Sequence, residues 1–282
     1  MQSDLLHSLS SGPIGVFDSG FGGLTILREM RRLLPQYDYM FLGDNARAPY
    51  GSHSFDVVYD YTRQCVEYLF SKGCPLVILA CNTASAKALR TIQMNDLPEW
   101  NKDKRVLGII RPTAEHVSEY TRTGHVGLFA TTGTVTSQSY PIELSKINQG
   151  IEVSSVACPM WVPLVENGEY DNEGADYFVR KKVEELLSLD SKIDSVILGC
   201  THYPILLEKI RKYLPQSVQI ISQGEIVAQS LKDYLSRHTD LDAFLTRSGS
   251  CEFLTTESEE KFKHAAQVFL NNSEISAKKV VI

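Results

Sequence analysis

Two short segments of this chain carry a cysteine in nearly the same setting. Residues 77–83 read VILACNT and residues 196–202 read VILGCTH, so Cys81 and Cys200 each follow a run of buried-strand residues and precede hydrogen-bonding side chains. Ligands of open α/β sheets bind at the carboxyl ends of the strands. A helix N-terminus, expected after each cysteine, stabilises a thiolate, the form in which a thiol acts as a base or nucleophile. Two matched thiols facing one substrate would suit a reaction with mirror-image halves.

Two titratable side chains are candidates to assist these thiols. His202 lies two residues after Cys200 and could accept or supply a proton there, and Asp18 could do the same near Cys81. A lone histidine is more often a hydrogen-bonded core residue, but its place beside a repeated cysteine favours a functional role.

Two loops of the first half could hold an anion. Residues 18–25, DSGFGGLT, follow a predicted strand and open a helix, where glycines allow close approach and backbone N–H groups attract negative charge. The pattern is neither GxGxxG nor a P-loop, so it favours a small carboxylate over a nucleotide, with a tight turn of no function as the alternative. Residues 43–51, GDNARAPYG, contain Asp44 and Arg47, which we expect to form a structural ion pair, and Tyr50-Gly51, whose N–H groups could bind an acid.

The second half offers hydroxyl groups and a carboxylate at corresponding places. Residues 131–134, TTGT, replace the acid and glycines of the first half and suit hydrogen bonding to an anion. Residues 158–166, CPMWVPLVE, end in Glu166, which is either a further acid–base group or a solvated loop carboxylate.

Metal binding is an alternative use of the cysteines. Cys200 and His202 are too close in sequence for the usual zinc patterns, and no histidine is near Cys81. A composite site of Cys81, Cys200 and His202 would need a fourth ligand that the sequence does not indicate. No lysine lies in a motif typical of a pyridoxal Schiff base. We therefore expect neither a metal nor a cofactor.

Strand-like and helix-like segments alternate along the chain, which predicts parallel sheets covered by helices. In the first half we expect strands at 14–17, 39–42, 76–80 and 106–110, and helices at 25–34, 54–72 and 84–94. In the second half we expect strands at 126–129, 153–157, 196–198 and 218–221, and helices at 139–147, 174–187 and 205–213. After these come helices at 225–236 and 257–270 and a strand at 253–256.

The two halves look like a duplication. Residues 14–19 align with 126–131 and residues 106–109 with 218–221, both at an offset of 112, while the cysteines are 119 apart. A repeat of this length indicates duplicated domains rather than a solenoid. We predict two similar parallel-sheet α/β domains, 1–110 together with 222–282 and 111–221. The last 61 residues have no counterpart in the repeat and are expected to return to the first domain.

The composition is that of an ordinary globular enzyme. Hydrophobic residues make up 43% of the 282 residues and charged residues 22%, and a net charge of −6 argues against nucleic-acid binding. No apolar run reaches the roughly 20 residues of a membrane span, and residues 1–11 lack the features of a signal peptide. With six cysteines and no CxxC spacing, we expect a cytoplasmic enzyme with reduced thiols. Residues 1–11 and 273–279 are expected to be loosely ordered.

The complete set of motifs resembles the glutamate racemase family. The resemblance is carried in order by residues 15–20 (GVFDSG), 43–44 (GD), 49–51 (PYG), 80–85 (ACNTAS), 158–166 (CPMWVPLVE) and 198–204 (LGCTHYP). Any one of these motifs alone would be weak, but two cysteine motifs in this order over most of the chain are highly specific.

The resemblance implies two α/β domains related by pseudo-twofold symmetry, with the active site in the cleft between them. It implies a cofactor-independent interconversion of L- and D-glutamate that supplies D-glutamate for peptidoglycan synthesis, and a homodimer. By resemblance, Cys81 removes the α-proton of D-glutamate and Cys200 that of L-glutamate, with help from Asp18, His202 and Glu166. The resemblance also implies that the substrate is held by Asp18, Ser19, Tyr50, Gly51, Asn82, Thr83, Thr134, Thr201 and His202.

The chain departs from the family pattern at the predicted passage between the domains. Arg111 and Thr113 stand where an acidic residue and a glycine are expected, and Ala130 stands where glycine is frequent. We expect these changes to affect the domain interface or regulation more than the chemistry. Three other functions remain open: racemisation of aspartate or another small acid, binding of an acidic ligand without catalysis, and hydrolysis by one cysteine with a histidine.

Overall fold

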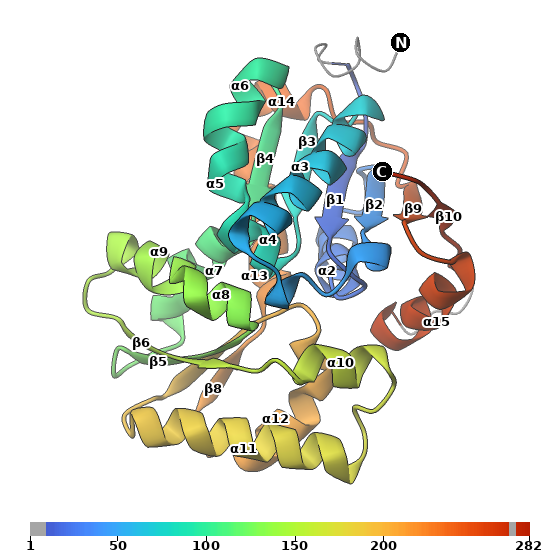
Figure 1. The fold of residues 1–282 in the computed structure, drawn as a ribbon. Helices are drawn as coiled ribbons and strands as arrows, with labels where there is room; N and C mark the ends of the chain where they lie inside the picture. Colours follow the sequence, from blue (N-terminus) through green and yellow to red (C-terminus); the bar gives the residue numbers. More distant parts are fainter. Residues whose placement is uncertain (1–9, 271–274) are drawn as a thin grey trace.

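The computed structural model of the protein describes residues 10–270 and 275–282. Two β-sheets, each flanked by helices, form two α/β domains that lie one above the other in Figure 1. The first sheet has the strand order β10-β9-β2-β1-β3-β4 and the second has the order β6-β5-β7-β8. All of the neighbouring strands run parallel, as the sequence predicts.

The strands of the first sheet are β1 (Ile14–Asp18), β2 (Tyr39–Gly43), β3 (Leu76–Leu79), β4 (Arg105–Gly108), β9 (Cys251–Thr255) and β10 (Lys278–Lys279). Those of the second sheet are β5 (His125–Ala130), β6 (Glu152–Ala157), β7 (Ser195–Gly199) and β8 (Gln219–Ile221). The helices up to the end of α9 are α2 (Leu24–Leu33), α3 (Phe55–Ser71), α4 (Asn82–Lys87), α5 (Leu89–Thr91), α6 (Leu97–Trp100), α7 (Ile110–His116), α8 (Thr132–Ser137) and α9 (Ser139–Ile147). The remaining ones are α10 (Trp161–Glu166), α11 (Glu173–Leu189), α12 (Leu207–Tyr213), α13 (Gln223–Arg237), α14 (Thr239–Asp242) and α15 (Glu259–Leu270).

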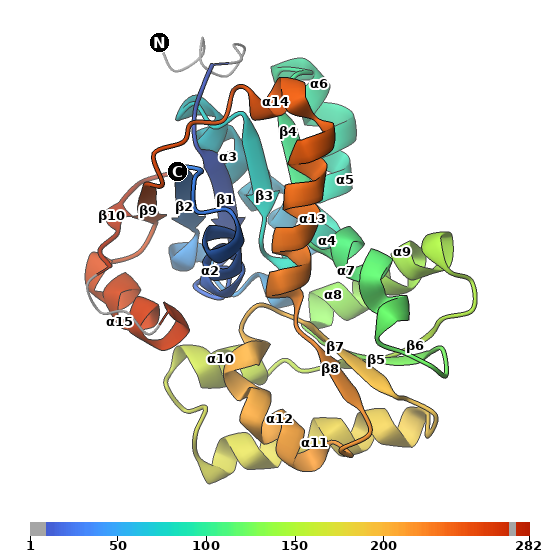
Figure 2. The ribbon, with the colours of Figure 1, turned by 180° about the vertical axis from the view of Figure 1, so that it is seen from behind.

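The central strands are apolar throughout because helices cover both of their faces. Every residue of β1 and of β7 is buried. Successive side chains of a strand point to opposite faces, so Val16 packs in a cluster with residues of α2, while Phe17 packs in another with residues of α3. Figures 1 and 2 show α3 on one side of the first sheet and α2 with α13 on the other. This double burial explains why the strands read as continuous hydrophobic runs.

Several segments of the structure differ from the prediction. The helix expected at 84–94 begins at Asn82, because the Cys81 Sγ caps it by accepting from the Ala84 N–H at 3.4 Å, and it is broken into α4, α5 and a π-helical turn at Ile92–Asp96. The strand expected at 106–110 ends at Gly108. Helix α8 was not predicted; its start is capped by Thr131, and Gln138, with φ 54°, separates it from α9.

The last part of the chain returns to the first sheet. Strand β9 pairs with β2, and α13 packs against α2. The prediction of a loose segment at 273–279 is wrong for Lys278 and Lys279, whose backbone pairs with β9 as strand β10. Residues 1–9 and 271–274, which include most of the predicted loose leader, lie outside the described residues.

The chain passes between the two domains twice. It leaves the first sheet after β4 through α7, and it returns after β8 through α13 (Figure 2). Helices α7 and α13 pack on each other at this junction. Because both connecting helices lie at this junction, they do not mark one residue at which a domain ends. The domain limits 1–110 with 222–282 and 111–221 stay a prediction.

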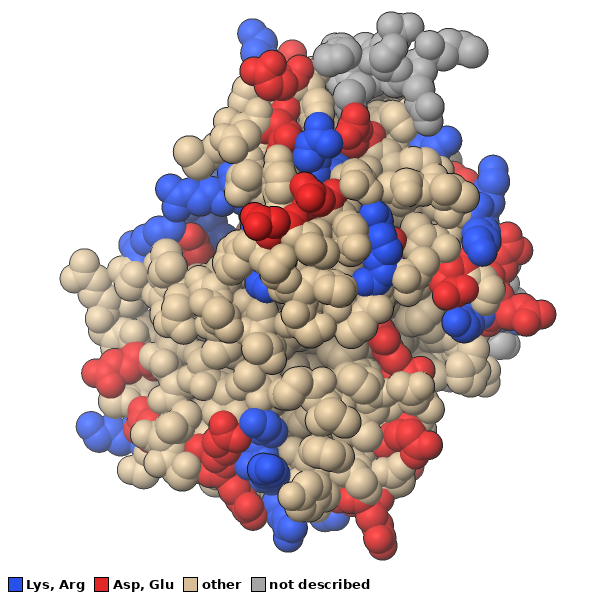
Figure 3. All heavy atoms as spheres, in the orientation of Figure 1, with Lys and Arg blue, Asp and Glu red and all other residues tan. Residues whose placement is uncertain are grey.

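Charged side chains are distributed without a dominant sign on the face shown in Figure 3, where acidic and basic residues are interspersed around a largely uncharged centre. Within residues 10–270 and 275–282, none of the helices has both the length and the apolar character needed to cross a membrane.

Candidate active site

One cavity lies where the carboxyl ends of four strands meet. Ser19 follows β1, Cys81 follows β3, Thr131 follows β5 and Cys200 follows β7, and all four line the same cavity. The two cysteines therefore face one space, as the repeated motif predicts. The cavity is lined by Ser19, Ala48, Pro49, Tyr50, Gly51, Cys81, Asn82, Thr83, Thr131, Val162, Glu166, Cys200, Thr201 and His202.

The cavity has a volume of about 20 Å³. This is room for roughly one water molecule. A small acid with several carbon atoms needs more space than this.

The Cys81 side of the cavity holds a neutral thiol. Cys81 is buried, and its Sγ lies 3.3 Å from Ser19 Oγ. Burial and the nearby Asp18 carboxylate raise the pKa of Cys81 to about 12, and they outweigh the hydrogen bonds from Ser19 and from the Ala84 N–H, which act in the opposite direction. Cys81 is therefore protonated at neutral pH in this closed state.

Asp18 directly precedes Ser19 but is not among the residues that line the cavity, and one of its oxygens has no hydrogen-bond partner within the described residues. Its Oδ2 accepts from the Gly20 N–H at 3.0 Å, whereas its Oδ1 is buried and has no hydrogen-bond partner within the described part of the chain. Burial raises the pKa of Asp18, and the charge of His202 acts against that rise. A buried oxygen without a partner at a cavity of this kind is suited to meet a ligand or a proton.

The Cys200 side carries a cation. The His202 ring places Nδ1 3.8 Å from Cys200 Sγ and Nε2 2.9 Å from Glu166 Oε1. Burial alone would lower the pKa of His202, but its hydrogen bonds to Cys200 and Glu166 raise that pKa to about 10. The protonated ring donates from both nitrogens, so a positive charge lies directly beside the Cys200 thiol.

Glycines of the 18–25 loop let the second domain approach. A Cβ on Gly22 would lie 2.3 Å from Thr201 Oγ1 and 2.5 Å from His202 Nδ1, which is too close for any side chain. A Cβ on Gly20 would lie 2.9 Å from Glu166 Oε1. The sequence indicated these glycines as a possible anion site; in the structure they make room for the His202 side of the cavity.

Three threonine hydroxyl groups join the two domains at the edge of the cavity. Thr83 Oγ1 lies 2.9 Å from Thr131 Oγ1, which lies 3.1 Å from Thr134 Oγ1. Thr131 lines the cavity, although it was not among the predicted substrate-binding residues. The predicted residue Thr134 is buried behind it and reaches the cavity through this cluster. The position of Thr131 directly after a strand, matching Ser19 in the repeat, was the signal that could have identified it.

The loop at 48–51 forms one wall of the cavity, as expected of a loop containing Pro49. Its conformation depends on Asp44: the Tyr50 hydroxyl and Arg47 Nε (2.6 Å) both donate to Asp44 Oδ2, which confirms the predicted ion pair. Asp44 is completely buried, and its other oxygen accepts from Thr256 Oγ1 at 2.9 Å. The returning C-terminal segment therefore helps to hold this wall.

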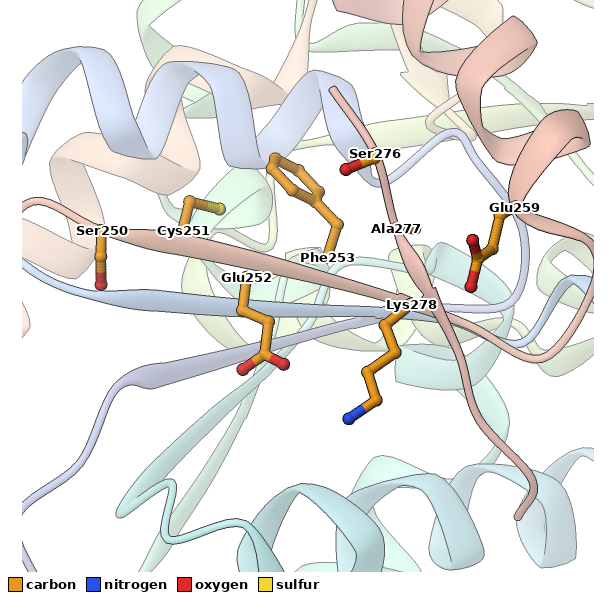
Figure 4. A pocket seen from close by; sticks show the side chains of 8 residues that line it. All are labelled: Ser250, Cys251, Glu252, Phe253, Glu259, Ser276, Ala277 and Lys278. Atoms are coloured by element: carbon orange, nitrogen blue, oxygen red, sulfur yellow. The ribbon is translucent and has the colours of Figure 1, made fainter. Parts of the chain in front are cut away.

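Two other features are separate from this cavity. His125, Glu152 and Asp190 form a group with metal-binding geometry near the amino end of β5, where His125 Nδ1 is already 2.6 Å from Asp190 Oδ2. A hollow of about 500 Å³ is bordered by β9, β10 and the start of α15. Figure 4 shows the side chains that line it. Its cysteine, Cys251, has a pKa raised to about 12, chiefly by burial. Neither feature contains the pair of thiols.

The family can be assigned once this geometry is compared with known proteins. The profile of the Asp/Glu/Hydantoin racemase family matches residues 14–231, which include both cysteines, the whole second sheet and strands β1 to β4 of the first. This chain belongs to that family. It is therefore a racemase, which is an isomerase.

Individual relatives and structures agree with this assignment. The racemase is 42% identical over 267 residues to the glutamate racemase of Roseobacter denitrificans, covering 91% of this chain and 96% of the relative. Its fold is similar to the crystal structure of glutamate racemase isoform RacE1 from Bacillus anthracis, with a TM-score of 0.87, 34% identity and coverage of 96% and 98%. It is also similar to the glutamate racemase of Francisella tularensis in complex with D-glutamate, with a TM-score of 0.83, 32% identity and the same coverage.

Proposed function

We propose that this racemase interconverts L- and D-glutamate without a cofactor, by a two-thiol acid–base mechanism. The observation that carries the proposal is the single cavity lined by Cys81 and Cys200 at matching strand ends of the two domains. The choice of glutamate is supported by the names of the relatives and by the D-glutamate bound in the Francisella tularensis protein.

The reaction requires two acid–base groups on opposite faces of one carbon. A thiolate removes the α-proton, the electron pair of the broken C–H bond stays on the α-carbon, and the thiol on the other side protonates that carbon on its opposite face. We assign the α-proton of D-glutamate to Cys81 and that of L-glutamate to Cys200. Each turnover leaves the two cysteines with exchanged protonation states, so the reverse reaction uses the same two groups.

The side chains around the thiols have different parts in this scheme. The imidazolium of His202 stabilises a thiolate at Cys200, and Glu166 holds the ring in place through Nε2. Asp18, with its unused oxygen, is the assisting group on the Cys81 side. Acid–base assistance of this kind contributes roughly 10²–10⁴-fold to a rate.

Donors around the cavity would hold the substrate and stabilise the carbanion that develops at Cα. Hydrogen bonds to the α-carboxylate are strongest in a closed cavity without bulk water. We propose that these donors are provided by Ser19, Tyr50, Gly51, Asn82, Thr83, Thr134 and Thr201, with Asp18 and His202 next to the amine and the carboxylate.

The finer biological assignment follows from the same proposal. D-glutamate formed by this enzyme would be used for peptidoglycan synthesis and thus for the cell wall and cell shape. All six cysteines are free, and a mechanism that needs two reduced thiols suits the reducing cytoplasm. We also propose a homodimer, on the basis of the family resemblance alone.

Racemisation in D₂O tests the proposal. With two bases, product formed from either enantiomer should contain deuterium at Cα well before the recovered substrate does. Substrate that exchanges as fast as product forms would indicate one shared base. Loss of optical rotation without any exchange would contradict protonation by a second thiol, whose proton exchanges with the solvent. A thiol-alkylating reagent should stop the loss of rotation of L-glutamate.

Aspartate is the second candidate substrate, and turnover of the two acids compared under the same conditions decides between them. Tight binding of glutamate without loss of optical rotation would instead indicate a binding protein.

A further inference from the structure

Four buried side chains form one hydrogen-bonded group at the junction of the two domains. Asn82, Thr113, Tyr140 and Gln223 are each at most 3% exposed. Asn82 begins α4 in the first domain, Tyr140 lies on α9 in the second, and Thr113 and Gln223 lie on α7 and α13, the helices that follow the two crossovers. The group therefore links one helix of each domain with the two helices that follow the crossovers.

Three of these side chains close a ring of hydrogen bonds. Asn82 Nδ2 donates to Gln223 Oε1 at 2.6 Å, and Gln223 Nε2 donates to the Tyr140 hydroxyl at 2.7 Å. The Tyr140 hydroxyl donates in turn to Asn82 Oδ1 at 2.7 Å. One N–H of the Asn82 amide remains outside the ring, and Asn82 lines the cavity that holds the two thiols.

Thr113 sets the direction in which the donors of this ring run. Its hydroxyl donates to the Ile109 carbonyl oxygen at 2.8 Å, which can only accept, so Thr113 Oγ1 is left to accept from Gln223 Nε2 at 2.8 Å. The reversed ring would lose the bond from Thr113 to Ile109. It would also put a carbonyl oxygen of Asn82 in the place of its amino group. Thr113 therefore favours the orientation in which Asn82 can donate a hydrogen bond rather than accept one.

We propose that Thr113, Tyr140 and Gln223 are positioning residues for the racemisation. They orient the amide of Asn82 so that its free N–H can meet a carboxylate of the substrate. This inference rests on the proposed function.

Kinetics of paired variants test the inference. In Thr113→Val the hydroxyl is lost and Asn82 can turn its oxygen toward the anion, so kcat/KM for glutamate should fall about tenfold, mainly through a higher KM. Thr113→Ser keeps the hydroxyl and should stay within about twofold of the wild type in KM, since the same hydrogen bonds form. Tyr140→Phe removes the donor to Asn82 and should raise KM at least as much as Thr113→Val does.

Tyr39→Phe is the matched control for loss of a buried hydroxyl. The Tyr39 hydroxyl donates to the Leu34 carbonyl oxygen at 3.0 Å, at the end of α2 and near the amino end of β2, away from the cavity. Its removal should lower the Tm but leave KM and kcat unchanged. If Thr113→Val and Tyr140→Phe also lower only the Tm, the four side chains are purely structural and the inference is overturned.

The two proposals fail in distinguishable ways. A wild-type enzyme that does not turn over glutamate contradicts the proposed function itself. An active wild type whose KM is the same in Thr113→Val, Thr113→Ser and Tyr140→Phe contradicts only the positioning role. Should Tyr140→Phe fail to fold, the pair at Thr113 still decides the question.

Discussion

The two thiol turns share a backbone plan but differ in their electrostatic surroundings. Cys81 lies beside a buried carboxyl group, Asp18, and a hydroxyl, whereas Cys200 lies beside a cationic imidazole that Glu166 holds in place. The duplicated fold accordingly places the two cysteines at matching strand ends. The side chains next to them differ in charge, with a carboxyl group near Cys81 and an imidazolium near Cys200. A reaction that passes one proton from face to face needs both, because one sulfur must be a base while the other is an acid.

The largest expected effect comes from removing either sulfur. Cys81→Ala and Cys200→Ala should each lower turnover of both enantiomers by roughly 10²–10⁴-fold, because both directions use both groups. Polarimetry on L- and D-glutamate measures this. Cys251→Ala, which changes a cysteine outside the cavity, should keep its activity. If either variant still racemises one enantiomer at the wild-type rate, the claim that both directions need both thiols is contradicted.

The second largest effect is expected at Gly22, which contacts Thr201 and His202 of the other domain. Gly22→Ala should lower kcat/KM by about 10²-fold, because the added Cβ would displace Thr201 and His202 from positions only 2.3 and 2.5 Å away. Overpacking of this kind also costs about 1–3 kcal/mol of stability. Steady-state kinetics with a thermal melt measure both effects. Gly168→Ala makes a useful comparison, since no atom lies within 4 Å of a Cβ there, although its φ of +75° adds backbone strain. Equal kinetics for the two variants would contradict the contact.

Isotope effects sharpen the comparison between the two sides. Because the enantiomers have equal free energy, kcat/KM is the same in both directions for any variant, and only the identity of the slow step can differ. His202→Asn should increase the primary α-deuterium isotope effect with L-glutamate, whose proton we assign to Cys200. Asp18→Asn should increase it with D-glutamate. Competition between α-deuterated and ordinary substrate measures both effects, and the opposite pattern would exchange our assignment of the two cysteines.

The smallest effect concerns stability against pH. Folding raises the pKa of His202 from 6.5 to about 10, so the folded state binds more protons than the unfolded state between these values. The stabilisation is therefore complete below about pH 6.5 and is lost as the pH rises toward about 10. Urea unfolding at several pH values should show this decline in the wild type and a weaker one in His202→Asn. Identical slopes would show that His202 is not charged in the folded protein.

Much of this fold follows from local pattern, because double burial leaves a strong hydrophobic signal. Strands such as β1 and β7 were located from their apolar residues alone. The return of the C-terminal part to the first sheet was predicted because those residues have no counterpart in the repeat. Helix α8 was missed because its threonines have low helix propensity, and it depends on the cap at Thr131. Strand β10 was missed because it contains only Lys278 and Lys279, whose pairing depends on backbone groups rather than on apolar side chains.

The candidate site divides in the same way. Cys81, Cys200 and His202 could be named from the sequence, because their repeated motif follows predicted strands, and the carboxyl ends of such strands are where ligands bind. The hydrogen bond between Thr83 and Thr131, the one between His202 and Glu166, and the ring around Gln223 could not be predicted, because each joins residues that are distant in the sequence.

The sequence by itself determined which atoms are available: two thiols, each at the end of a buried strand. The helix start expected after each thiol is found at Cys81, which caps α4, but not at Cys200, which a turn separates from a 3-10 helix at Tyr203–Leu206. Tertiary structure alone decided that the strand ends with the two cysteines border one cavity. It also decided that Gly22 has no room for a side chain and that His202 is protonated. The physical reason is that strand pattern and helix capping act over a few residues. Burial, charge and close contact depend on which distant residues share the same space.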